Sequence, residues 1–162
     1  MSSLAGLWSE QSMNAALRDK ALQLLFYRAH SRKELRDKLL RRVNPDETEL
    51  EEVLDWLIEM RFLDDRSYAA SVVRHCTSRG YGTSRVIAEL NRRGIDRSFR
   101  EEALQEMPKV DDTLDRLIRG KLKNPEDRDE VRKVAASMMR RGYSYEEVRQ
   151  AMERLSAMEE FD

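Results

Sequence analysis

Positively charged side chains recur at corresponding positions in three stretches of this 162-residue sequence. Arginine and lysine bind phosphates and carboxylates, because they combine a positive charge with several hydrogen-bond donors. In each stretch an aromatic residue or a histidine follows an arginine by two positions. The candidate residues for binding an anionic partner lie in these stretches or directly beside them: Arg28, His30, Arg32, Lys33 and Arg36; Arg79, Tyr81, Arg85, Arg92 and Arg93; and Arg140, Arg141 and Tyr143.

The recurring residues also have structural explanations. Each ring can pack over a turn between two helices, and we favour this over contact with a partner. The arginine pairs at 92–93 and 140–141 lie near predicted helix ends, where positive charges interact favourably with the helix dipole. The dipole does not account for Arg32, Lys33 and Arg85, which fall in corresponding helices. Stacked repeats would gather these cations into one stripe, so we favour a binding function for them.

The sequence contains no recognisable catalytic or metal-binding motif. It lacks a Gly-rich phosphate loop, an HExxH helix, paired Cys and His ligands and a Gly-x-Ser-x-Gly turn. His30 stands beside Ser31, but no second base and no orienting carboxylate is indicated nearby. The pair Asp64 and Asp65 precedes an apolar helical pattern, so we interpret it as a helix cap with an acidic first turn. We expect neither enzyme activity nor a bound metal or cofactor.

The formal net charge of −1 conceals a strong segregation of charge along the chain. Residues 28–42 contain seven basic and two acidic side chains, whereas residues 46–65 contain nine acidic side chains and one basic. Positive charge dominates again between residues 74 and 97. We interpret the acidic block as a solvated helix face, with contact to a basic partner surface or repulsion of DNA as the alternatives.

A helical unit is repeated along the chain. Residues 28–39 (RAHSRKELRDKL) align with residues 79–90 (RGYGTSRVIAEL) and with residues 141–152 (RGYSYEEVRQAM). The apolar positions agree in all three copies, and the similarity extends upstream into the preceding helix. Repetition of this kind indicates stacked units, since one short unit cannot bury its apolar stripe alone.

Local signals predict where the helices begin and end. Gly80 and Gly142 lie where a helix needs a residue that tolerates positive φ, with Ala29 in the equivalent place of the first copy. Ser/Thr-x-x-Glu patterns predict capping boxes at four helix starts: Ser31 with Glu34, Thr48 with Glu51, Ser98 with Glu101, and Ser144 with Glu147. In the middle unit, Thr83 or Ser84 must cap without such a glutamate.

The remaining boundaries follow from Gly94, which predicts a helix end, and from Asn124 followed by Pro125, which predicts a helix start. The predicted helices are 14–29, 32–42, 48–60, 65–79, 83–93, 97–106, 110–122, 126–141 and 145–157. No stretch shows the alternation of a half-buried strand. We therefore expect an all-α protein of three tandem three-helix repeats, stacked into an elongated, curved array. The predicted parts are a mobile N-terminal arm (1–12) and repeats at 13–63, 64–108 and 109–162.

The composition indicates the cellular compartment to expect for this protein. The single cysteine, Cys76, excludes an intramolecular disulfide and lies in a helical pattern, so we expect a buried thiol. The N-terminal residues do not resemble a signal peptide, and nowhere do eighteen apolar residues occur together. We expect a monomeric, cytoplasmic protein with no membrane partner.

Four segments resemble the signatures of the RecX family: HSRKELRDKL, FLDDRSYA, RGYGTSRVIAELNRRGI and MMRRGYSYEEV. The resemblance covers about residues 15 to 157. It implies a bacterial regulator of recombination that binds the RecA recombinase filament, lies along its helical groove, and restrains ATP hydrolysis and strand exchange in DNA repair. It also places the recurring cations and rings on the surface that faces the filament or DNA.

Two other functions fit the residues. The basic stripe could act as a single-stranded-DNA-binding module without a protein partner, in which case binding should weaken steeply with salt. The chain could alternatively be a general helical adaptor for another protein.

Overall fold

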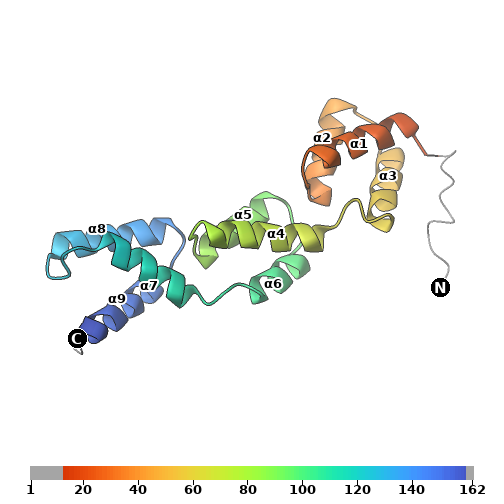
Figure 1. Ribbon diagram of the computed structural model, residues 1–162. Coiled ribbons are helices and arrows are strands. Elements are labelled where there is room, and N and C mark those ends of the chain that lie inside the picture. Colours follow the sequence, from red (N-terminus) through yellow and green to blue (C-terminus); the bar gives the residue numbers. More distant parts are fainter. Residues whose placement is uncertain (1–12, 160–162) are drawn as a thin grey trace. The chain divides into compact units, whose positions relative to one another are not determined.

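The structure, a computed structural model, describes residues 13–159 (Figure 1). Within them the chain forms nine helices and no strand, which confirms the predicted all-α fold. The predicted arm, residues 1–12, lies outside the described residues. The chain divides into two compact units. The first unit comprises residues 13–69 and Asn91–Phe99, and the second comprises Ala70–Leu90 and residues 100–159.

The first unit contains α1 (Ala15–Tyr27), α2 (Arg32–Arg42) and α3 (Glu47–Glu59). Their leucines recur at helical spacing, so each helix directs an apolar stripe towards the other two. The core consists mainly of Leu17, Leu24, Leu35, Leu39, Leu50, Val53, Leu54, Trp56, Leu57 and Leu63. Several of these side chains are completely buried, which provides the main stabilisation of this group.

The next helices are α4 (Asp65–Ser78), α5 (Thr83–Arg92) and α6 (Arg97–Gln105). The carboxylate of Asp64 accepts a 3.2 Å hydrogen bond from the backbone N–H of Ser67 and a 2.9 Å bond from its hydroxyl. Asp64 therefore caps α4, as predicted. The thiol of Cys76 is buried, which also agrees with the prediction.

The second unit ends with α7 (Val110–Lys121), α8 (Arg128–Arg140) and α9 (Tyr145–Glu159). Helices α7 and α9 make the most extensive of the contacts between these three. Their shared core consists of Leu114, Ile118, Val134, Met138, Tyr143, Val148 and Ala151. This core fixes the carboxyl ends of α7 and α8, which carry cations.

The predicted helix boundaries agree with the observed ones to within two residues. Two predicted capping boxes are confirmed. The Ser31 hydroxyl accepts the N–H of Glu34 at 3.0 Å while the Glu34 carboxylate accepts the N–H of Ser31 at 3.2 Å. Ser144 and Glu147 make the same reciprocal pair at 3.1 and 2.9 Å. Gly94 adopts a positive φ of 71°, as a helix end requires.

Two other predicted capping boxes are wrong. Helix α3 begins two residues earlier than a Thr48 cap requires, because the Asp46 carboxylate accepts the N–H groups of Thr48 and Glu49. Glu51 pairs instead with arginines of α2. Helix α6 begins at Arg97, so Ser98 lies inside its first turn.

Three smaller boundary predictions also need correction. Helix α8 begins at Arg128 with Asp127 as its cap, while the Asn124 side-chain oxygen accepts the N–H of Glu126 in the preceding turn. Helix α1 ends through an extended Arg28, so Ala29 takes no positive φ. Helix α5 begins at Thr83, which places neither Thr83 nor Ser84 before the helix.

Candidate functional site

Five cations surround a shallow depression of about 500 Å³ in the second unit. They come from the α4–α5 turn, from α5 and from the carboxyl ends of α7 and α8. We call this feature the second-unit cationic surface: Arg79, Arg85, Lys121, Arg140 and Arg141, together with Tyr81 and Ser137. Four of the five cations were predicted from the sequence. Lys121 was not predicted, because only the packing of α7 against α8 brings it beside Arg140 and Arg141.

No carboxylate within residues 13–159 neutralises this surface. Among the described residues, none of its five cations forms an ion pair with Asp or Glu. Cations without partners keep their full attraction for an external anion, because no internal pair has to be broken first. The arrangement suits phosphates or an acidic protein face.

Contacts within the second-unit cationic surface hold its side chains in place. The guanidinium of Arg141 donates a 3.0 Å hydrogen bond to the backbone carbonyl of Arg79. The Arg85 guanidinium lies 3.9 Å from the centre of the Tyr81 ring, at cation–π distance. Lys121 is bound to the α8 face by a 3.0 Å hydrogen bond to the Ser137 hydroxyl.

Backbone contact between two turns brings these helices together. The N–H of Gly82 donates to the carbonyl of Arg141 at 2.9 Å, and the N–H of Ser84 donates to the carbonyl of Gly142 at 3.2 Å. A Cβ on Gly82 would lie 2.5 Å from the Gly142 carbonyl carbon, so only glycine allows this approach. The Ser84 hydroxyl donates a further 2.8 Å bond to Gly142. The α4–α5 turn and the α8–α9 turn therefore pack backbone against backbone.

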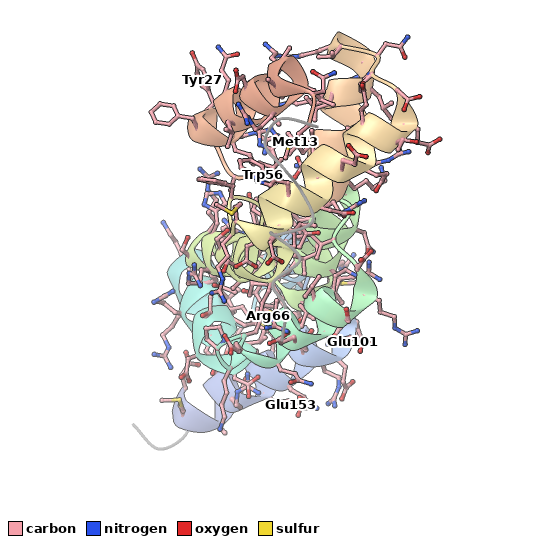
Figure 2. All side chains as sticks on the ribbon, turned by 90° about the vertical axis from the view of Figure 1, so that its right-hand side faces the viewer. Met13, Tyr27, Trp56, Arg66, Glu101 and Glu153 are labelled. Atoms are coloured by element: carbon pink, nitrogen blue, oxygen red, sulfur yellow. The ribbon has the colours of Figure 1, made fainter. Side chains whose placement is uncertain are left out.

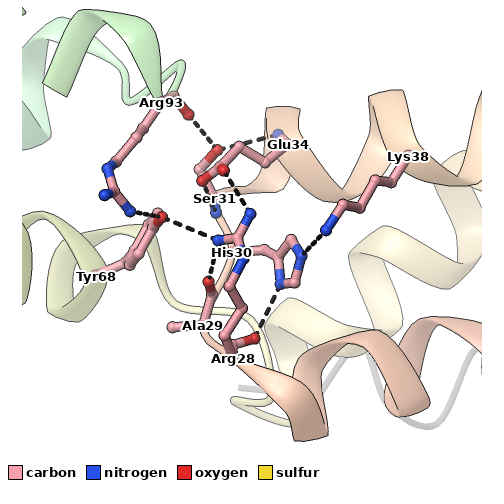
Figure 3. Close-up of polar contacts among 8 residues, drawn as sticks. All are labelled: Arg28, Ala29, His30, Ser31, Glu34, Lys38, Tyr68 and Arg93. Atoms are coloured by element: carbon pink, nitrogen blue, oxygen red, sulfur yellow. Dashed lines mark hydrogen bonds and ion pairs between the residues drawn. The ribbon is translucent and has the colours of Figure 1, made fainter. Parts of the chain in front are cut away.

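The recurring ring positions are mostly structural. Tyr143 is only 3% exposed, and its hydroxyl donates a 2.9 Å hydrogen bond to the carbonyl of Gly80. Burial raises the pKa of Tyr143. His30 is 2% exposed, with Nδ1 2.9 Å from the Arg28 carbonyl and Nε2 3.0 Å from Lys38 Nζ (Figure 3). Both rings are buried over helix–helix turns, whereas Tyr81 is only partly buried and borders the second-unit cationic surface.

The predicted cations of the first unit are engaged within the chain. Arg32 forms ion pairs with Glu51 and Asp55, and Arg36 forms them with Glu47 and Glu51. The acidic block predicted to be solvated therefore neutralises α2 from α3. These pairs compete with any external anion for the two arginines.

Lys33 and Arg28 are also paired. Lys33 contacts Asp37 at 2.8 Å along α2, and Arg28 contacts Glu34 at 3.1 Å. Arg28 also lies 3.4 Å from the Tyr68 hydroxyl, which accepts a hydrogen bond from Arg93 (Figure 3).

Arg92 and Arg93 belong to the first unit, apart from the second-unit cationic surface. The Arg93 backbone carbonyl accepts a hydrogen bond from the Ser31 hydroxyl, so the α2 capping serine also holds the end of α5 (Figure 3). The Asp65 carboxylate accepts the N–H of Arg32 at 2.8 Å, although α4 follows α2 by more than twenty residues. Burial raises the pKa of Asp65. The cations predicted to form one stripe therefore fall into two groups. Those of the first unit are engaged within the chain, whereas those of the second-unit cationic surface form no ion pair with a described carboxylate.

His30 makes folding sensitive to mild acid. Burial is the main cause that lowers its pKa below the ordinary value, so the folded chain binds a proton less readily than the unfolded chain. Stability should therefore fall as the pH drops below about 6.5, by at most about 1.4 kcal/mol per pH unit from this residue. Urea unfolding between pH 7 and 5 should show a shallower pH dependence for His30→Asn. If stability depends on pH as steeply in His30→Asn as in the wild type, this assignment is wrong. His75 is exposed, so His75→Asn is the control.

The described residues contain no group of three or more His, Cys, Asp or Glu side chains arranged to hold a metal ion. Over the same residues, no helix combines the length and the apolar character that crossing a membrane requires.

Comparison with known proteins matches each three-helix group in order. The first, second and third three-helix domains of RecX match residues 18–57, 64–104 and 111–152. These matches lie inside the predicted repeats, whose outer boundaries stay a prediction.

Whole-chain similarity agrees with the domain matches. Regulatory protein RecX of Halorhodospira halophila is 35% identical over 84% of this chain and 86% of its own length. The RecX of Pseudomonas entomophila is 41% identical over 56% of this chain and 58% of its own length. The crystal structure of RecX from Lactobacillus salivarius superposes with a TM-score of 0.75 at 25% identity, covering 88% of this chain and 96% of that one. The chain therefore belongs to the RecX family of regulatory proteins.

Proposed function

We propose that this protein is a negative modulator of the RecA recombinase, which binds in the groove of RecA–DNA filaments and slows their ATP hydrolysis and strand exchange. Membership of the RecX family supports the choice of partner. The observation that carries the binding step is the second-unit cationic surface, whose five cations have no carboxylate partner in the described residues.

The geometry supports binding rather than catalysis. The cations are spread around an open depression, and three of the five are held in place by hydrogen bonds or by stacking on Tyr81. A ligand that binds one state of a filament more tightly lowers the population of the other states. Binding across neighbouring RecA subunits would therefore slow a cycle of hydrolysis that requires those subunits to change state.

The proposal predicts a direct effect on RecA. Saturating amounts of the full chain should slow DNA-dependent ATP hydrolysis by RecA on single-stranded DNA by about fivefold or more, a typical coupling between two binding events. A phosphate-release assay with increasing protein measures the effect. An unchanged rate at several-fold excess over filament sites would refute the proposal. Heat-unfolded protein at the same concentration is the control for nonspecific inhibition.

Single-stranded DNA binding without RecA is the second candidate, favoured by the same unpaired cations. Co-sedimentation with RecA–DNA filaments, with and without nucleotide, distinguishes the candidates when bare DNA is run in parallel. Retention only with RecA supports filament binding, whereas equal retention on bare DNA supports the second candidate. Absence of retention in both would favour an adaptor for another protein.

A further inference from the structure

Two adjacent aromatic side chains at the end of α1 project into solvent. Phe26 is 92% exposed and Tyr27 is 85% exposed, and Figure 2 shows Tyr27 at the surface of the first unit. Exposing two neighbouring rings is unfavourable, because their apolar surface remains in contact with water. Exposed aromatic clusters of this kind mark sites that a ligand covers.

A basic depression of about 450 Å³ lies beside Tyr27, which directly follows Phe26 in the chain. Tyr27 lines it together with four cations, and no acidic residue lines it. We call this feature the α1–α2 basic–aromatic surface: Phe26, Tyr27, Lys20, Arg28, Lys38 and Arg42. Arg28 pairs with Glu34, but Lys20, Lys38 and Arg42 form no ion pair within residues 13–159.

The buried His30 holds the ammonium of Lys38 in this depression. His30 Nδ1 faces the Arg28 carbonyl and donates to it, so Nε2 is left to accept from Lys38 Nζ at 3.0 Å (Figure 3). Burial, followed by the positive charges of Arg28 and Arg42, lowers the pKa of Lys38. The cations therefore repel one another, and an anion bound among them would relieve that repulsion.

Rings and cations in this combination fit one class of ligand. Unpaired nucleotides offer a flat base for stacking next to a phosphate, whereas the bases of a duplex are already stacked and paired. From this juxtaposition we infer that the α1–α2 basic–aromatic surface binds single-stranded nucleic acid, with bases on Phe26 and Tyr27 and phosphates on Lys20, Lys38 and Arg42. This site is separate from the second-unit cationic surface and does not depend on the RecA proposal.

Anisotropy of a labelled 15-nucleotide strand with the full chain tests the site. Phe26→Ala with Tyr27→Ala should weaken binding by about tenfold while leaving the salt dependence unchanged, because stacking involves no counterions. Phe26→Trp with Tyr27→Trp should retain the affinity. Lys20→Ala with Arg42→Ala should weaken binding and reduce the slope of log K against log salt by about 1.4. Lys38 is left intact because its removal would strip His30 of a partner.

Matched controls separate the site from the rest of the surface. Tyr145 is 66% exposed on α9, so Tyr145→Ala removes a comparable ring elsewhere, and Arg128→Ala with Lys133→Ala removes two exposed α8 cations. Neither should change the affinity. Repeating the series in an Arg79→Glu, Arg140→Glu background reduces the contribution of the second-unit cationic surface, whose formal charge falls from +5 to +1.

Several results would overturn the inference. The inference is wrong if the wild-type chain does not bind the strand, or if the Phe26→Ala, Tyr27→Ala variant binds it with wild-type affinity. It is also wrong if the control variants lose as much affinity, or if the variants lose as much affinity for duplex DNA. Parallel measurements with single-stranded DNA and single-stranded RNA show which of the two the site prefers. A preference for either one supports the site. Circular dichroism confirms that each variant is folded.

Discussion

Exchanging Arg79 and Arg140 together for glutamate is expected to lower the affinity for RecA–DNA filaments by about 100-fold at low salt. Both side chains border the second-unit cationic surface, and neither makes an ion pair or a side-chain hydrogen bond in the described residues. The exchange therefore lowers the formal charge of the five cationic positions from +5 to +1 without breaking an internal side-chain contact. Inhibition of ATP hydrolysis should weaken in parallel. Co-sedimentation and ATPase titration, each at several salt concentrations, measure the two effects.

A variant with the same change in net charge provides the control. Arg128 and Lys133 are exposed on α8 but lie outside the depression. Arg128→Glu with Lys133→Glu should therefore reduce the affinity only slightly, through the weaker long-range attraction. An equal loss in both variants would show that net charge, rather than this surface, determines binding. The paired arginines give a second contrast, since Arg36→Ala should affect stability slightly and filament affinity little.

Gly142→Ala is expected to destabilise the protein by about 2–4 kcal/mol. Gly142 has a φ of 103°, which residues with a side chain rarely adopt. A Cβ there would lie 2.7 Å from the backbone nitrogen of Arg85 and 3.0 Å from the carbonyl oxygen of Gly82. These are backbone atoms, so the two turns must separate to admit the methyl group. Urea unfolding should show a lower midpoint.

Gly120 is the matched control for this substitution. It lies within α7, and a Cβ added to it would meet no atom within 4 Å. Gly120→Ala should therefore stabilise the protein by about 0.5–1 kcal/mol, because alanine loses less backbone entropy in a helix. Equal effects of the two substitutions would contradict the role assigned to the contact between the turns. Separation of the turns in Gly142→Ala should also move Arg141 away from Arg79 and weaken filament binding.

The helices and most of their ends could be predicted because the deciding contacts are local. Ser31 and Glu34 satisfy each other within one turn, so their spacing alone indicates a helix start. Where more than one side chain can cap a helix start, the spacing of the residues is not sufficient to choose between them. Asp46 caps α3 although Thr48 and Glu51 fit the pattern better.

The candidate binding surface was only partly predictable. The repeat indicates equivalent cations in each copy, but it carries no information about which helix packs opposite them. In the first unit Arg32 and Arg36 face the acidic residues of α3, so the repeated charge is neutralised there. On the corresponding helix of the second unit, Arg85 stacks on a ring and forms no ion pair with a carboxylate of the described residues.

The sequence by itself determined an all-α chain of repeated three-helix groups, its main helix stops and its membership of a regulatory family. Apolar spacing, caps and glycines act within a few residues, so they can be read along the chain. Only the tertiary structure decided which cations remain unpaired, that His30 and Tyr143 are buried, and that Lys121 joins Arg79 and Arg140 around one depression. An ion pair or a shared surface depends on distances between separate helices, and those distances are set by packing.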